Sequence, residues 1–203
     1  MTETEKALLD AALRVFSRYG VKRSSMADLC QEAGVSRQTL YNWFGSKDDI
    51  LRSLIDRYTD TAIAEIEDKL DTVTDLGGKL DVIFERMAIC GYDMVQAMPN
   101  AQDFIDGVNA VSAEAVEHSG CRFRALIAGV LAPHEAALAR AGIGVAELSD
   151  FIHRAAKSAT TTARDRAHLV TQLQTLRQLC TSAASQDAPD LSSTRKNEYG
   201  QQA

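Results

Sequence analysis

Two short helical segments separated by a glycine turn set the strongest constraint on how this sequence can fold. Ser25 is suited to begin the first segment as an N-cap, with Asp28 three residues later as its partner in a capping box. Gly34 ends this segment, and it suits a left-handed turn because it has no Cβ. Ser36 then caps the second segment. Two short helices joined by such a turn predict a helix-turn-helix over residues 25–44.

The two sides of this motif differ in chemistry. A small shared core is expected from its apolar residues, which are Leu29, Ala33, Val35, Leu40 and Phe44, and Trp43 is also expected to be core. The second helix then exposes Arg37, Gln38, Thr39, Tyr41 and Asn42. Arginine pairs with guanine, glutamine and asparagine pair with adenine, and a threonine methyl contacts thymine. These residue types indicate a helix that reads base edges in a major groove.

The charge distribution supports the same interpretation, although the overall charge does not. A net charge of −6 and a pI of about 5.2 argue against a nucleic-acid partner. Residues 11–47, however, contain six basic and two acidic side chains, whereas residues 51–203 contain fifteen basic and twenty-one acidic ones. A basic head on an acidic body suits duplex binding, because phosphate contacts supply most of the non-specific affinity.

Helical periodicity continues along most of the chain. Apolar residues recur at helical spacing within residues 5–19, 46–70, 80–94, 104–108, 116–131, 145–159 and 169–180. Pro99 and Pro133 are expected to end or kink helices. The sequence therefore predicts an all-α fold of about nine helices, with a three-helix head at 1–47 and a helical domain at 48–184. Residues 185–203 are polar and are expected to form a disordered tail.

Several other classes of function find no support in the sequence. Four widely spaced cysteines, Cys30, Cys90, Cys121 and Cys180, are expected to be reduced and mostly buried, with no metal site. The apolar stretch from Ala125 to Ala132 is far too short to span a membrane, and a polar, acidic N-terminus does not suit a signal peptide. No catalytic triad spacing, phosphate loop or paired carboxylates stand out. We therefore expect a cytoplasmic protein without a cofactor that is not an enzyme.

The head resembles a known family. SSMADL at residues 24–29 and AGVSRQTLYNWFGSK at residues 33–47 resemble the head of the TetR (tetracycline repressor) family. The resemblance begins near Ala7, includes Phe16 before Gly20, and extends to about Ile55. Trp43 departs from the pattern, because such heads often carry histidine there.

This resemblance implies a role for each polar residue of the head. Phosphate contacts are implied for Ser25, Ser36 and Lys47. Major-groove contacts are implied for Arg37, Gln38, Thr39 and Asn42, and a contact with the sugar-phosphate chain for Tyr41. Double-stranded operator DNA is thus the expected partner.

The resemblance also implies a homodimeric repressor that a small molecule releases from its operator. Candidate residues for the effector pocket are Tyr58, Phe84, Met87, Met94, Phe104 and Phe123, and each could equally be ordinary core. The last two helices are expected to form the dimer interface through Phe151, Ile152, Ala155, Leu169, Leu173 and Leu176. A ligand would move the long helix that follows the head and spread the two heads.

Two other functions remain open at this stage. The same fold could act as a DNA-bound interaction protein that has no small-molecule effector. A ligand-carrying helical bundle that ignores DNA is disfavoured by residues 36–47, whose polar side chains suit a DNA groove.

Overall fold

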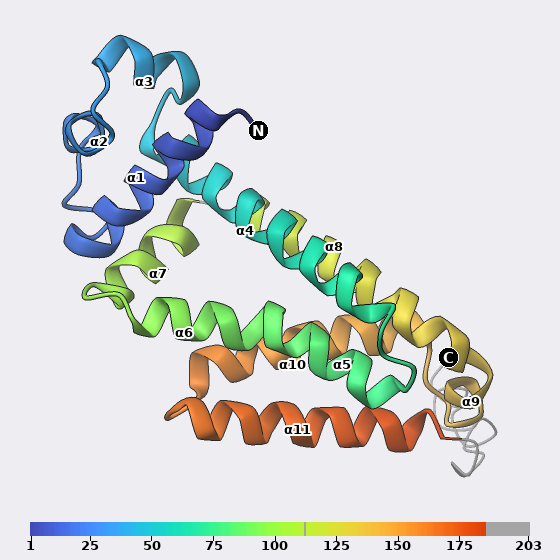
Figure 1. The fold of residues 1–203 in the computed structure, drawn as a ribbon. Helices are drawn as coiled ribbons and strands as arrows, with labels where there is room; N and C mark the ends of the chain where they lie inside the picture. The colour runs from blue at the N-terminus through green and yellow to red at the C-terminus, as the bar shows by residue number, and fades with distance from the viewer. Residues whose placement is uncertain (112, 186–203) are drawn as a thin grey trace, which may run out of the picture. The chain divides into compact units, whose positions relative to one another are not determined.

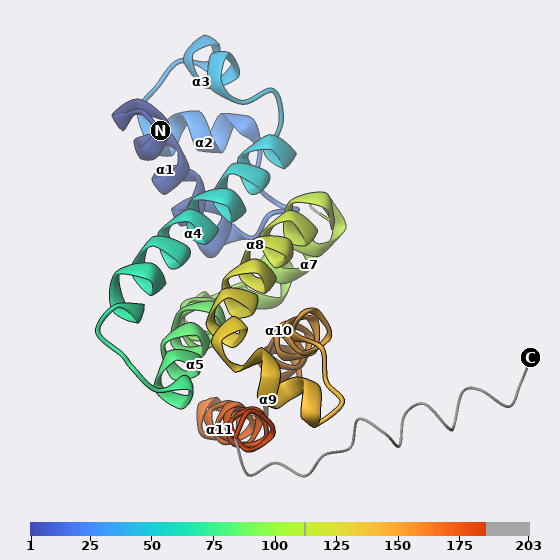
Figure 2. The same ribbon diagram turned by 90° about the vertical axis from the view of Figure 1, so that its right-hand side faces the viewer.

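The computed structural model describes residues 1–111 and 113–185, and it confirms the expected all-α class (Figures 1 and 2). This described part of the chain consists of helices and the turns between them, with no strand. It forms two compact units: unit 1 contains Met1–Thr61 and Asp93–Ser119, and unit 2 contains Ala62–Tyr92 and the described residues from Gly120 onward. The tail expected after residue 184 lies, apart from Ser185, outside the described residues.

Unit 1 contains the predicted head together with parts of later helices. Its elements are α1 (Glu3–Tyr19), α2 (Met26–Ala33), α3 (Arg37–Trp43), the first part of α4 (Lys47–Leu70), the end of α6 (Cys90–Gln96), α7 (Ala101–Val111) and the start of α8 (Ala113–Leu131). The helix ends follow the local sequence. Ser25 and Asp28 form a reciprocal capping box at the start of α2, and Gly34 ends α2 in the left-handed region with φ of 67°.

The core of the head follows the sequence pattern in part, since Ala33 and Val35 are half-buried against it. Leu29, Leu40 and Phe44 are buried, as expected. Trp43 was expected to be core, but 40% of its surface is exposed. The reason is that α3 has only seven residues, and Leu40 and Phe44, four positions apart, already fill the inward side of this short helix.

Unit 2 is built from the remaining helices. Its elements are the end of α4, α5 (Leu76–Phe84), a π-helical turn η1 (Glu85–Ile89), the start of α6, most of α8, a 3-10 turn η2 (Ala132–His134), α9 (Glu135–Arg140), α10 (Val145–Thr162) and α11 (Arg166–Ala183). The single helix expected over residues 80–94 is thus interrupted by the π turn. Beyond Pro133, the short helix α9 has no counterpart in the sequence prediction.

The core of unit 2 lies among α5, α10 and α11, where Leu80, Ile152 and Leu169 are fully buried. Polar contacts tie the helices together at the surface. Arg177 of α11 donates to Asp81 of α5 at 2.9 Å.

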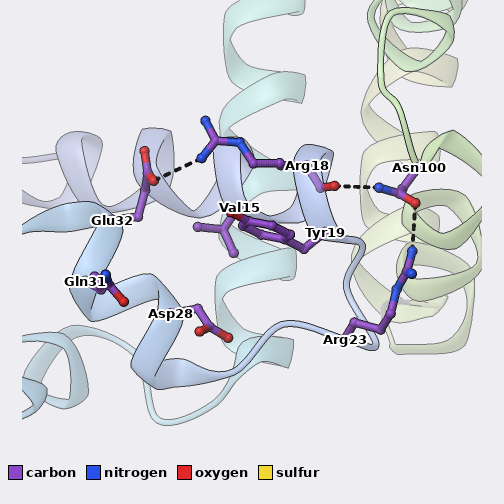
Figure 3. Close-up of a pocket in the computed structure, with 8 residues that line it drawn as sticks. All are labelled: Val15, Arg18, Tyr19, Arg23, Asp28, Gln31, Glu32 and Asn100. Atoms are coloured by element: carbon purple, nitrogen blue, oxygen red, sulfur yellow. Dashed lines mark hydrogen bonds and ion pairs between the residues drawn. The ribbon is translucent and has the colours of Figure 1, made fainter.

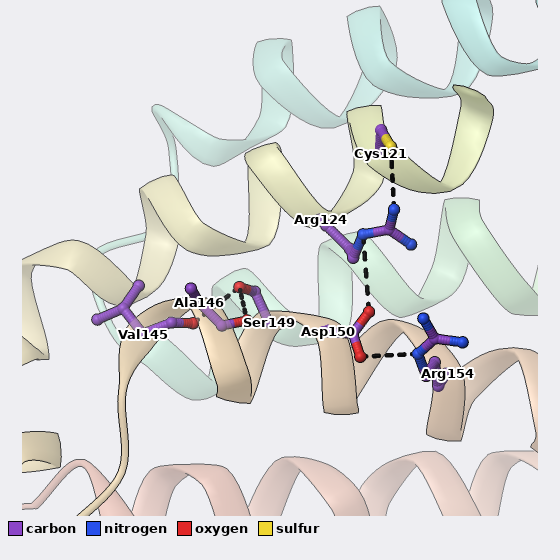
Figure 4. Close-up of polar contacts among 7 residues, drawn as sticks. All are labelled: Cys121, Arg124, Val145, Ala146, Ser149, Asp150 and Arg154. Atoms are coloured by element: carbon purple, nitrogen blue, oxygen red, sulfur yellow. Dashed lines mark hydrogen bonds and ion pairs between the residues drawn. The ribbon is translucent and has the colours of Figure 1, made fainter. Parts of the chain in front are cut away.

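A second polar cluster joins α8 to α10 (Figure 4). Arg124 contacts the Cys121 sulfur at 3.0 Å and lies 3.7 Å from Asp150. Asp150 also accepts a 2.7 Å hydrogen bond from Arg154, and this bond is the main cause that lowers the pKa of the Asp150 carboxyl. These contacts connect the two helices at the surface, and each adds little stability.

The four cysteines differ in how deeply they are buried. The four cysteines are free thiols, of which Cys30 and Cys180 are buried and Cys121 is exposed. Burial raises the pKa of the Cys180 thiol to about 11, so this thiol is protonated at neutral pH.

In the described part of the chain, no single helix is long and apolar enough to cross a bilayer, although the bent pair Ala113–Arg140 and Val145–Thr162 together meets the length and composition criteria.

Candidate nucleic-acid interface and effector cavity

The outer face of α3 presents the polar side chains that the sequence singled out. Arg37, Gln38, Tyr41 and Asn42 are exposed, and Thr39 is half-buried. The Gln38 side-chain amide donates to the Asn42 amide oxygen at 2.8 Å. This pair uses one group of each amide, so the Gln38 oxygen and the Asn42 amino group are available as an acceptor and a donor for base edges.

The hydroxyl groups of Ser25 and Ser36, which cap the starts of α2 and α3, form hydrogen bonds within the protein. Ser36 accepts from the Thr39 backbone N–H at 3.1 Å. The Ser25 hydroxyl donates to Asp28 at 2.7 Å, and this bond is the first cause that lowers the pKa of the Asp28 carboxyl. A phosphate at Ser25 must therefore either replace this hydrogen bond or use the backbone N–H groups at the start of α2.

Lys47 has a structural role that the sequence did not reveal. Its half-buried ammonium donates to the carbonyl oxygens of Val21 at 2.8 Å and Ser24 at 2.7 Å. The first residue of α4 is thereby joined to the loop that precedes α2. An ammonium group has three N–H donors, so one remains for a phosphate.

We predict that Lys47→Met weakens both the head and its DNA binding. The head should lose about 1–3 kcal/mol of stability because two loop carbonyls lose a charged donor. Affinity for specific and random DNA should fall alike, and the salt slope should drop by about one, because a phosphate contact carries no sequence information.

Denaturant titration and fluorescence anisotropy would measure the two effects. Trp43, the single tryptophan, reports on unfolding of the head. Lys69→Met is the matched control, since it removes an exposed lysine from the last turn of the same helix. A Lys47→Met protein with wild-type stability and salt slope would contradict both roles.

Part of the basic charge of the head is neutralised within unit 1. Glu32 of α2 accepts from Arg14 at 2.7 Å and lies 3.8 Å from Arg18. The hydrogen bond from Arg14 is the main cause that lowers the pKa of the Glu32 carboxyl. The positive excess read from the sequence is therefore smaller at the surface than the residue count suggests, and Arg37 on α3 carries more of the attraction to phosphate.

Residues at the start of α7 form hydrogen bonds with the end of α1 and with the loop between α1 and α2 (Figure 3). Sequence reasoning missed these contacts. Asn100 donates to the Arg18 carbonyl at 2.6 Å and accepts from the Arg23 guanidinium at 2.7 Å. Asp103 accepts from the Lys22 backbone N–H at 3.2 Å. These contacts join residues 77 to 82 positions apart, and no local periodicity could signal them.

Unit 1 also contains a largely apolar cavity of about 330 Å³. Of the six residues proposed from the sequence for an effector pocket, Tyr58, Met94 and Phe104 line this cavity. Phe84 and Phe123 are instead buried in unit 2, and Met87 is half-buried there in the π turn η1.

The residues proposed for a dimer interface lie at very different depths in unit 2. Ile152, Leu169, Leu173 and Leu176 are all buried within the protomer. Ala155 is half-buried. Phe151 of α10 is 57% exposed.

Leu179, which is not among the residues proposed for the interface, completes an apolar face on α10 and α11. Leu179 is 64% exposed. It lines, with Phe151 and Leu176, a shallow hollow of about 300 Å³. We call this the α10–α11 face. Its two large exposed side chains make it the apolar surface on this pair of helices that a partner could cover.

Comparison with known proteins gives a consistent result for the head. Residues 8–54 match the family described as bacterial regulatory proteins, tetR family. The HTH-type transcriptional repressor ComR of Escherichia coli K12 is 38% identical over 64 residues, which cover 32% of this chain and 30% of ComR. The probable regulator ArpR of Pseudomonas putida is 30% identical over 92 residues, which cover 43% of this chain and 44% of ArpR. The chain thus matches less than half the length of these relatives.

The fold of most of the chain also has counterparts among solved structures. A putative transcriptional regulator from Pseudomonas aeruginosa PAO1 superposes with a TM-score of 0.66 at 19% identity, covering 89% of this chain and 91% of that one. The regulator FadR from Bacillus subtilis superposes with a TM-score of 0.60 at 19% identity, covering 88% and 98%. At such low identity these likenesses concern the fold alone. The match over residues 8–54 and the curated relatives show that the head of the chain belongs to the TetR family of bacterial regulatory proteins.

Proposed function

We propose that the protein is a homodimeric transcriptional repressor that binds an operator in the cytoplasm and leaves it when a small molecule occupies the cavity of unit 1. The observation that carries the DNA-binding part is the outer face of α3, where Arg37, Gln38 and Asn42 stand exposed on one short helix. These side chains are of the types that pair with guanine and adenine in the major groove. A helix-turn-helix dimer reads two half-sites about one DNA turn or more apart.

Selection from a random double-stranded DNA library would test this function. The expected result is a two-fold symmetric motif whose affinity falls with salt. Binding that shows no sequence preference at moderate salt would contradict a repressor that acts at an operator.

We predict that Gln38→Ala relaxes base preference at the position that Gln38 contacts in each half-site, at a cost of roughly 1–3 kcal/mol. The loss should extend to the base that Asn42 contacts, because Gln38 fixes the Asn42 amide. Repeating the library selection with the variant would measure the change.

A matched control exists on α7. Gln102 donates to Asp106 at 2.8 Å over the same spacing of four residues, so Gln102→Ala removes a similar surface pair away from α3. If Gln38→Ala returned the wild-type motif, Gln38 would have no role in base recognition.

Dimer formation is proposed through the α10–α11 face. Phe151 and Leu179 expose large apolar surfaces there, and a two-fold contact would cover both of them twice. Two helices from each protomer would then form a four-helix interface.

Effector release is proposed because the cavity lies in the same compact unit as the head. The Bacillus subtilis FadR structure, which shares the fold, contains stearoyl-CoA, so a protein of this architecture can hold a small molecule. A ligand that prefers the conformation unable to bind DNA must weaken operator binding by linkage. In a thermal-shift screen, an effector should raise the melting temperature. A protein that binds its operator but responds to no ligand would instead fit a DNA-bound interaction protein.

A further inference from the structure

We propose that the cavity of unit 1 selects a compact, uncharged and largely apolar molecule that carries a single hydrogen-bond donor. The assignment rests on the proposed function, because it gives the chemical class of the effector. It follows from the size, charge and hydrogen-bonding groups of the cavity wall.

The size and the wall favour a compact apolar occupant. The volume of about 330 Å³ lies near the lower end of the roughly 300–1,000 Å³ typical of small-molecule sites. Leu13 of α1, Leu54 of α4, and Met94, Phe104 and Val108 from α6 and α7 supply much of the wall. Covering such side chains with an apolar ligand removes them from water and is therefore favourable.

The positive charge on the wall of the cavity is already neutralised by an ion pair. Among the described residues that line the cavity, Arg57 has the one charged side chain. Its guanidinium donates to Asp10 at 2.7 Å and to the Lys6 carbonyl at 3.3 Å, and only 18% of the side chain is exposed. A carboxylate, sulfonate or phosphate entering the cavity would lose its hydration and would meet a cation whose charge is already shared with Asp10. The cavity is thus selective against anions.

The polar side chains of the wall include Tyr58 and Thr61 as well as a pair of contacting hydroxyl groups, and this pair indicates the polar part of the ligand. Thr59 donates to the Ile55 carbonyl at 2.8 Å, and its oxygen lies 2.7 Å from the Ser119 oxygen. A hydroxyl has only one proton, so Ser119 donates to Thr59 while Thr59 donates to the Ile55 carbonyl. The Ser119 oxygen then retains its capacity to accept, and a donor such as a phenol or an aromatic amine is its natural complement.

The position of the cavity connects its occupant to the head. Leu13 belongs to α1, the first helix of the head, and Phe104 lies one residue after Asp103 in α7. Asn100 and Asp103 hold the loop between α1 and α2. A ligand that displaces Phe104 therefore acts on the element that fixes this loop.

Two fluorescent probes with the same aromatic skeleton test the proposal on the full-length protein. N-phenyl-1-naphthylamine is neutral and has one N–H donor, and 1-anilinonaphthalene-8-sulfonate adds an anionic group. We expect saturable binding of one neutral probe per protomer. The sulfonate should bind ~10-fold or more weakly, because burying an unpaired charge costs more than burying a neutral hydrogen-bonding group.

Three variants and one matched control test whether the binding occurs in this cavity. Val108→Phe should fill the space and abolish binding of the neutral probe, whereas the matched control Val145→Phe, at the start of α10 in unit 2, should retain it. Asp10→Asn should strengthen binding of the sulfonate several-fold and leave the neutral probe unchanged, because it frees the Arg57 guanidinium. Ser119→Ala should weaken the neutral probe about two- to tenfold, as expected for the loss of one hydrogen bond.

Equal affinity for the two probes, or wild-type binding by a folded Val108→Phe protein, would overturn the proposal. Operator binding should be measured with the same preparations, because it shows whether the ligand class or the proposed function is at fault. Operator binding without probe binding would refute the ligand class only. Probe binding that leaves operator affinity unchanged at saturation would support the class and refute release by this site.

Discussion

Replacing Leu179 by glutamate should convert the protein into a monomer that no longer holds a DNA fragment with two half-sites. Leu179 is 64% exposed, so the change costs the protomer little. In a two-fold interface the lost contact occurs twice. Because burying one leucine side chain contributes about 1.5–3 kcal/mol, the dimer should lose about 3–6 kcal/mol before the repulsion of the two carboxylates is added. That corresponds to a dimer dissociation constant raised ~100-fold or more.

Light scattering and analytical ultracentrifugation would measure this change, with a single half-site duplex as a check that the head still binds. Gln174→Glu is the matched control, since it places the same charge on an exposed part of α11 that borders a different hollow, beside Asp81 and Arg177. The Leu176 side chain is a poorer choice because it is only 7% exposed, so that charge there would disturb the protomer itself. A Leu179→Glu protein that remains a dimer would place the interface elsewhere.

Gly20→Ala should destabilise the head by roughly 2–4 kcal/mol, from backbone strain and one broken hydrogen bond. Gly20 follows α1 with φ of 84° and ψ of 160°, a conformation that is essentially restricted to glycine. An added Cβ would also overlap the Asp103 carboxylate, whose Cγ would lie at 2.8 Å. Asp103 would have to release the Lys22 N–H that it now accepts.

The unfolding midpoint followed by Trp43 fluorescence would report this loss. Gly129→Ala provides a control of opposite sign, because Gly129 lies exposed within α8 and an added Cβ there meets no atom within 4 Å. That variant should gain about 0.5–1 kcal/mol, since alanine loses less conformational freedom than glycine in a helix. Equal effects of the two substitutions would show that the Gly20 conformation imposes no constraint.

The parts of the structure that could be predicted from sequence are those set by neighbouring residues. Capping by Ser25 and Ser36, the left-handed turn at Gly34 and the buried Leu40 all follow from spacings of a few positions. The helix-turn-helix and the all-α class were therefore predictable. The exposed polar face of α3 was predictable for the same reason.

What could not be predicted depends on contacts between distant segments. Periodicity marks Leu173 and Leu179 alike as apolar positions of one helix, but only the packing of α11 shows that the first is buried and the second exposed. Likewise, Lys47 reads as a cation near a helix start, and its two carbonyl partners lie 23 and 26 residues earlier in the chain. Trp43 is exposed because α3 is short, although its side chain is apolar enough for a core position.

The hydrogen bonds from the start of α7 to the loop between α1 and α2 affect how the head folds during translation and how it can be exchanged between proteins. Asn100 and Asp103 are translated long after the loop they hold, and a Cβ on Gly107 would lie 2.8 Å from the Val21 side chain. The head therefore reaches its final form only after α7 has left the ribosome, although its own helices can form earlier. A chimera that joins residues 1–47 to the body of another regulator would lack these partners. Exchange of DNA specificity between such proteins should succeed only when α7 is transferred along with the head.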